Sequence, residues 1–84
     1  PIFNDKDGSP LDAGFIYFGE LNKSPLTSPI AIFYDSALTM PAENPVRTQN
    51  GFVSKNGFLR QVFCAEPVIS IQVQNKQKEI VWSS

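Results

Sequence analysis

Carboxylates are the side chains of this sequence whose type and number could support catalysis. Two carboxylates held about 5–9 Å apart can hydrolyse a glycosidic bond, one as the acid and the other as nucleophile or base. The acidic residues fall mostly in expected turns or at the ends of expected strands: Asp5, Asp7, Asp12, Glu20, Asp35, Glu43, Glu66 and Glu79. No pair has an apolar surround that would raise one pKa. The pattern therefore favours solvated turn residues, and a small carboxylate hydrolase stays an open alternative.

Other catalytic and metal-binding groups are missing from the sequence. The chain contains no histidine, which excludes a nucleophile activated by an imidazole base. Its single cysteine, Cys64, lies in an apolar stretch typical of a small buried side chain. Residues 4–8 hint at a calcium loop, but the positions where an EF-hand carries Gly and Glu hold Pro10 and Ile16. The sequence therefore predicts no catalytic residue, no cofactor and no metal ion.

Charge and hydropathy limit the classes of partner. The formal net charge is −1 and the basic residues are scattered, so no basic patch is available to neutralise the phosphates of a nucleic acid. The apolar runs are much shorter than the roughly 20 residues that a membrane-spanning helix needs. Neither a nucleic acid nor a membrane is expected as a partner.

The elements that carry these side chains are expected to be short β-strands. Prolines at positions 10, 25, 29, 41, 45 and 67 leave little room for helices, and no window shows the apolar spacing of an amphipathic helix. In residues 13–21, Ile16 and Phe18 point to one face and Phe15 and Tyr17 to the other. Because both faces are apolar, this strand should be covered on both sides. Further strands are expected over 30–34, 46–49, 52–55, 58–63, 68–74 and 78–82, with 38–40 as a continuation and 41–45 as an extended connector.

Alternation of side chains predicts which face of the strand over 68–74 is buried. Its branched apolar residues share one face and its polar residues the other, so Ser70, Gln72 and Gln74 should face solvent or a neighbouring subunit. The expected core residues are Ile16, Phe18, Ile32, Ile69, Ile71 and Val73.

Two Asn-Gly pairs predict tight reversals of the chain. Asn50-Gly51 and Asn56-Gly57 suit type I′ hairpin turns, in which both central residues take positive φ. They enclose a very short strand. The fold class predicted from the residues is all-β, with short antiparallel strands in a small sandwich or barrel.

The chain is small for an independently stable domain. At 9.3 kDa it would bury only roughly 63% of its unfolded surface on folding. Domains of this size often gain further stability from disulfides, bound metal ions or oligomerisation. One cysteine excludes an internal disulfide, so oligomerisation is expected. Aromatic side chains beyond the capacity of the core would then mark a subunit interface; the candidates are Phe15, Tyr17, Phe18, Phe33, Tyr34 and Trp82.

Read along its whole length, the chain resembles the N-terminal head-binding domain of bacteriophage tailspikes. It opens with Pro1-Ile2-Phe3, and Ala13–Gly19 is similar to that family's strand, with Gly14, Tyr17 and Gly19 at motif positions. Residues 29–34 resemble the next strand. Residues 44–57 resemble a proline-led strand followed by two glycine turns, the motif residues being Pro45, Asn50, Gly51, Asn56 and Gly57. Residues 70–73 and 80–81 fit the family's closing strands.

The resemblance implies a function in virion assembly. Residues 1–84 would be one virion-anchoring domain, a trimeric cap of two small β-sheets at the N-terminus of a longer tailspike or tail fibre. The homotrimer would attach this receptor-binding or polysaccharide-degrading protein to a tail, neck or baseplate protein of the phage tail. Any polysaccharide-degrading enzyme that takes part in attachment to the host would lie C-terminal to residue 84. The absence of an initiator methionine is expected for a fragment.

A carbohydrate-binding or adhesin-like β module is the alternative function. Exposed aromatic rings can stack on sugar rings, and the same aromatic strands would then form a ligand platform. Glycan arrays separate the two hypotheses, because an anchoring domain should bind no sugar.

Overall fold

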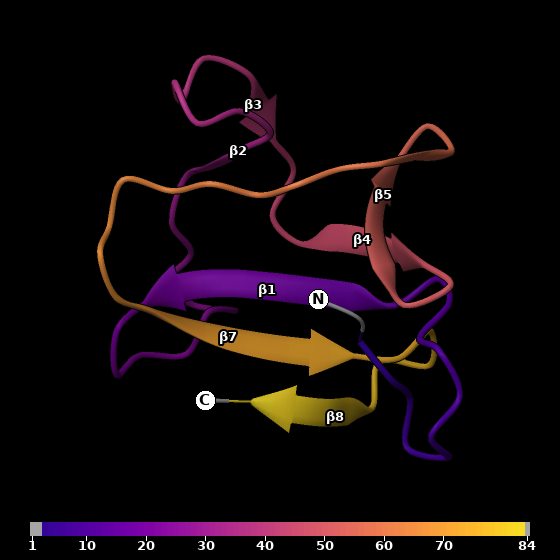
Figure 1. Ribbon diagram of the computed structural model, residues 1–84. Coiled ribbons are helices and arrows are strands. Elements are labelled where there is room, and N and C mark those ends of the chain that lie inside the picture. Colours follow the sequence, from indigo (N-terminus) through magenta and orange to yellow (C-terminus); the bar gives the residue numbers. More distant parts are fainter. Residues whose placement is uncertain (1–2, 84) are drawn as a thin grey trace.

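Eight strands and no helix make up residues 3–83, the part of the chain that the computed structural model describes (Figure 1). The strands are β1 (Phe15–Glu20), β2 (Ile32–Phe33), β3 (Pro41–Ala42), β4 (Val46–Gln49), β5 (Phe52–Lys55), β6 (Phe58–Leu59), β7 (Ile69–Gln74) and β8 (Ile80–Ser83). They form a six-stranded sheet in the order β6-β5-β4-β1-β7-β8 and a two-stranded sheet of β2 and β3. All pairings are antiparallel, which confirms the predicted all-β class with two small antiparallel sheets.

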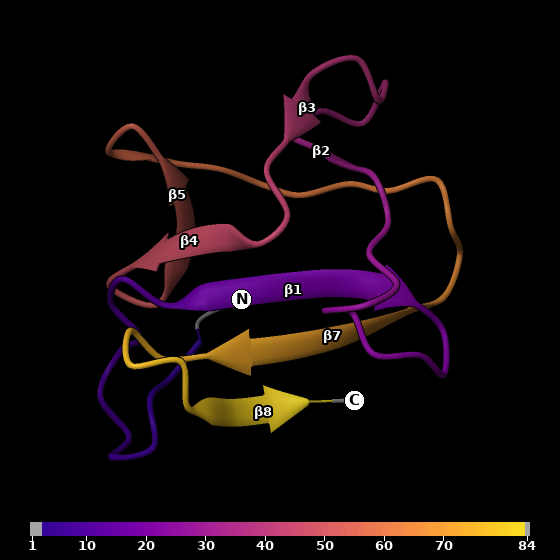
Figure 2. The ribbon, with the colours of Figure 1, turned by 180° about the vertical axis from the view of Figure 1, so that it is seen from behind.

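Strand β1 lies at the centre of the large sheet and organises its core face. It pairs with β7 along its whole length, from Phe15 opposite Gln74 to Glu20 opposite Ile69. Its partner on the other side, β4, pairs only with the first two residues of β1. The two views of the ribbon show the small sheet of β2 and β3 beyond this unpaired half of β1, on the side away from β8 (Figures 1 and 2).

The core is a thin layer on one face of the large sheet. Its buried apolar residues are Leu11, Ile16, Phe18, Ile32, Val46 and Val73. Of the residues expected here, Ile69 and Ile71 are only partly buried and pack against this cluster. Leu11 was missed because it follows Pro10 in a segment without strand alternation. Six buried side chains are few for a chain of this length.

The second face of the sheet is covered more fully than the alternation predicts. Ser70 and Gln74 are 3% and 6% exposed, so the prediction that they face solvent is wrong, and Gln72 is half-buried. The loop after β1 folds back here, and the Ser70 hydroxyl lies 2.9 Å from the carbonyl oxygen of Glu20 and 2.8 Å from that of Lys23. A polar side chain can be buried in this way because a loop backbone supplies its hydrogen bonds.

Both Asn-Gly pairs form the predicted turns. Asn50 and Gly51 have φ of 51° and 87°, and Asn56 and Gly57 have φ of 54° and 81°. Positive φ at both central residues is what a type I′ turn requires. The turns join β4 to β5 and β5 to β6.

Several predicted strands are shorter in the structure. Those expected over 30–34 and 58–63 are reduced to β2 and β6, and residues 38–40 form no strand. The Asp35 carboxylate accepts hydrogen bonds from the backbone N–H groups of Thr39 and Met40, both at 2.9 Å. This side chain therefore closes a loop where a strand was predicted, and part of the expected connector becomes β3.

The side chain of Asn44 forms hydrogen bonds to the backbone at the place where β1 is no longer paired with β4. Its Oδ1 accepts a hydrogen bond from Phe18 N at 3.0 Å. Its Nδ2 donates to the carbonyl oxygens of Phe18 at 2.6 Å and Ile30 at 3.0 Å. The Phe18 carbonyl also accepts from Ile30 N, and Glu20 N donates to Ser28 O. One amide thus replaces a missing strand and joins β1 to the segment that leads into the small sheet.

Replacing Asn44 by alanine should destabilise the fold by about 2–4 kcal/mol, because partly buried backbone groups lose their partners and each costs about 1–3 kcal/mol. Urea unfolding measures the change. Asn4→Ala is the matched control, since Asn4 is exposed, and its cost should stay within about 0.5 kcal/mol. Equal urea midpoints for the two variants would contradict this role of Asn44.

Candidate functional site

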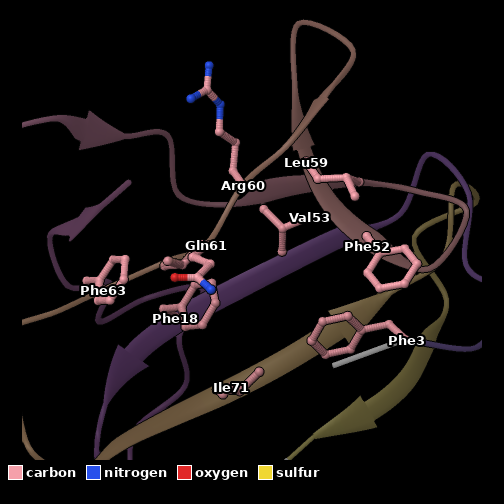
Figure 3. Close-up of a pocket in the computed structure, with 10 residues that line it drawn as sticks. Phe3, Phe18, Phe52, Val53, Leu59, Arg60, Gln61, Phe63 and Ile71 are labelled. Carbon is pink, nitrogen blue, oxygen red and sulfur yellow. The ribbon is translucent and has the colours of Figure 1, made fainter. Parts of the chain in front are cut away.

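An apolar groove of about 570 Å³ lies on the core face of the large sheet (Figure 3). Phe18 of β1 and Ile71 of β7, which are paired across the sheet, contribute to it from below. The remaining lining comes from the N-terminal segment, from β5 and from the chain after it: Phe3, Phe52, Val53, Leu59, Arg60, Gln61, Val62 and Phe63. Figure 3 shows the end of the Arg60 side chain pointing away from the groove, so the interior is mainly apolar.

The segment that follows β6 crosses the sheet and forms one wall of this groove (Figure 1). Arg60 N donates to Val53 O at 3.0 Å, which holds the start of the segment. Phe63 and Phe33 exchange two backbone hydrogen bonds of 2.8 Å, which hold it to the small sheet. Between these points, Gln61 and Val62 make no backbone hydrogen bond to any residue that the structure describes. Their peptide groups are therefore available beside an apolar groove.

Four side chains brace the small sheet against the β5–β6 hairpin. Tyr34 Oη donates to Glu43 Oε2 at 2.9 Å, and Lys55 Nζ forms an ion pair with the other carboxylate oxygen of Glu43. The Arg60 guanidinium lies 5.8 Å from the centre of the Tyr34 ring. The hydrogen bonds from Lys55 and then Tyr34 lower the pKa of Glu43 to about 2. Burial, followed by the Glu43 hydrogen bond, raises the pKa of Tyr34 to about 12.

Three further carboxylates are held as anions by local turns. Hydrogen bonds from Ser9 lower the pKa of Asp7, those from Thr39 and Met40 lower the pKa of Asp35, and one from Asn75 lowers the pKa of Glu79. A general acid at neutral pH needs the opposite shift. Asp7 and Asp35 are thus held by hydrogen bonds within their own turns, and Glu79 is held by Asn75 and by an ion pair with Lys6.

The residues of the family-like motif do not meet in one place. Gly14, Tyr17 and Gly19 lie along β1 and its start, Pro45 follows Asn44, and the two Asn-Gly pairs occupy separate turns. Gly14 and Gly19 are required for packing: a Cβ would lie 2.6 Å from Leu11 Cγ at the first and 2.8 Å from Ser28 O at the second. The glycines among these motif residues are required by close packing or by turns, and the set as a whole is spread over separate parts of the fold.

Large apolar side chains are exposed at both edges of the six-stranded sheet. On β6, Phe58 and Leu59 are each 66% exposed, and on β8, Ile80 and Trp82 are 54% and 51% exposed. Five others lie elsewhere on the described surface: Leu21, Leu26, Met40, Phe52 and Val68. Sequence analysis had singled out Trp82 alone among these residues, because the β6 edge was expected to lie within a longer strand.

Comparison with models of known protein families finds no match, and comparison with curated proteins finds none either. Residues 3–83 contain no cluster of three acidic, cysteine or histidine side chains that could hold a metal ion. The described residues also contain no helix with the length and apolar character needed to cross a membrane.

The brace around Glu43 should give stability that depends on pH. The folded-state pKa of about 2 lies below the unfolded value of about 4.3. Its contribution is therefore present above the unfolded value and is lost as the pH falls towards 2. The melting temperature of the wild type minus that of Glu43→Gln should be positive at pH 7 and shrink between pH 5 and pH 2.

Glu66→Gln is the control for this experiment, because Glu66 is exposed and its side chain makes no ion pair within the described residues. The melting temperature of the wild type minus that of Glu66→Gln should stay near zero from pH 7 to pH 2. A Glu43→Gln difference that does not vary between pH 7 and pH 2 would show that the brace contributes nothing.

Proposed function

We propose that this chain is the virion-attachment module of a bacteriophage tailspike or tail fibre, a non-catalytic adaptor that acts as a homotrimer. The observation that carries the proposal is the imbalance between buried and exposed apolar side chains. In the described part of the chain six large apolar residues form the core, while nine are exposed. The order of the family-like segments along the sequence supports the same proposal.

Exposed apolar surface of this extent suits a protein that works by association. Contiguous apolar patches are uncommon on monomeric soluble proteins and mark places where another surface docks. Here they lie along two sheet edges and beside a groove, which is too much surface for a single small contact. Some of it would be covered between subunits, and the remainder would be available to a phage tail, neck or baseplate protein.

A trimer also gives a small domain the affinity that anchoring needs. One subunit of this size offers at most a modest docking area, and a standard interface buries about 800 Å² per partner. Three linked copies that engage three equivalent sites can raise the avidity by about 10²–10⁴ without any new contact. Docking is therefore expected to be long-lived for the trimer and weak for a single copy.

The groove fits this proposal better than it fits a sugar site. Sugars present many hydroxyl groups, and a site for them needs several placed polar partners. Only Arg60 and Gln61 are polar among the groove residues, and the Arg60 side chain points away from the interior (Figure 3). The carbohydrate-binding alternative is therefore kept as an outcome of the test.

The test removes residues 1–84 from the parent protein and adds the remainder to particles that lack the spike. The truncated protein should keep its receptor or sugar activity but fail to sediment with particles or restore infectivity. Isolated 1–84 should compete with the intact protein for particles and bind nothing on a glycan array. Normal assembly of the truncated protein, or glycan binding by isolated 1–84 without particle binding, would contradict the proposal.

A further inference from the structure

We infer that three copies join head to tail, with edge strand β8 of one copy adding to the β6 edge and its groove on the next copy. The inference rests on the trimer of the proposed function and assigns the two surfaces that form its subunit junction. It follows from the two open sheet edges, from the groove, and from the fact that one repeated contact can cover both edges of every copy.

Strand β8 is an open edge without the usual protection. An edge strand leaves a row of unpaired backbone N–H and C=O groups, and soluble proteins block such edges with charges, prolines or a covering segment. Ile80–Ser83 contains neither a charged residue nor a proline, and no described segment pairs with its outer side. Ile80 and Trp82 are 54% and 51% exposed. This edge therefore has the character of a strand that is covered in an assembly.

The β6 edge has the features that would receive such a strand. Peptides that bind by strand addition use free backbone groups for affinity and apolar pockets for alternate side chains. Phe58 and Leu59 form the outer strand on this side of the sheet, and no described strand pairs with their outer side. The groove beside them has a volume of about 570 Å³ and an apolar interior, which suits the side chains of an incoming Ile80 or Trp82.

The sheet order identifies the occupant as a second copy. Strands β6 and β8 are the two outer strands of one six-stranded sheet and are not paired with each other in a single copy. Pairing β8 with β8 across a two-fold axis would cover one edge and leave the other open. A head-to-tail contact uses both edges of every copy, and such a contact gives a closed ring when the rotation closes.

The exposed residues of the two edges supply part of the apolar area that this junction needs. Aromatic side chains carry roughly 150–250 Å² of surface. Phe58 and Leu59 are each 66% exposed, and Ile80 and Trp82 are 54% and 51% exposed, so each contributes on the order of 100 Å². The two edges thus offer roughly 400 Å², about half of the apolar area in a standard interface of about 1,600 Å², before the groove lining is added.

Substitutions at the two edges test the junction. Leu59→Arg changes only the receiving edge and Trp82→Arg only the donated strand. Leu21→Arg is the matched control, because Leu21 is also exposed, at 49%, and lines neither edge. By light scattering the wild type and Leu21→Arg should be trimers, and each edge variant should be a monomer with a wild-type far-UV circular dichroism spectrum.

Mixing the two edge variants tests the direction of the contact. Each retains one intact surface, so an equimolar mixture should form a dimer of unlike copies but no ring. An edge variant that remains trimeric, or a mixture that remains monomeric, would overturn the head-to-tail junction while the trimer itself stands. A monomeric wild type would instead remove the trimer on which the inference rests.

Tryptophan fluorescence provides a second readout that requires no substitution. Trp82 is the only tryptophan of the chain, and in a single copy this residue is 51% exposed. Its emission should shift to the red as the wild-type trimer is diluted to monomers, and Leu21→Arg should behave in the same way. Emission that does not change while the mass falls would place Trp82 outside the junction.

Discussion

The amide of Asn44 determines how this small chain arranges two sheets around one central strand. Along one side, the backbone of strand β1 is paired with β7 over its whole length. Along the other side, its first half pairs with β4 and its second half bonds to the segment around Ile30. A backbone that changes partner leaves N–H and C=O groups unpaired at the point of change, and such groups are costly when buried. There the Asn44 amide accepts one backbone hydrogen bond and donates two. These bonds stabilise the change of partner along β1.

The groove and the open edges depend on this division. The chain leaves β1 for the small sheet, and the segment after β6 is held to that sheet through Phe33 and Phe63. It crosses over the sheet as a wall and does not pair with β5 beyond Arg60. The result is a thin core with a groove above it, and a six-stranded sheet whose outer strands carry exposed apolar side chains. The same arrangement leaves one copy with a small core and with apolar side chains exposed to solvent.

Local chemistry explains which parts of this structure could be predicted from the sequence. The strands over 46–49 and 52–55 and both I′ turns agree with the structure because Asn-Gly and alternating side chains act within a few residues. Strands 30–34 and 58–63 were overestimated, since their length depends on pairing with distant segments. The burial of Ser70 depends on a loop folding back over the sheet. The groove combines residues from five separate parts of the chain, and no short motif encodes such a combination.

We propose that this domain gains part of its stability from association, because one copy has a small core and much exposed apolar surface. When folding is linked to assembly, the apparent melting temperature rises with protein concentration by mass action. The most direct measurement is therefore the melting temperature of residues 1–84 across a hundredfold range of concentration, with the mass recorded at each point. The account predicts a melting temperature that rises steadily with concentration and a mass of three chains of 9.3 kDa in the upper part of the range. A melting temperature independent of concentration, with the mass of a single chain throughout, would contradict it.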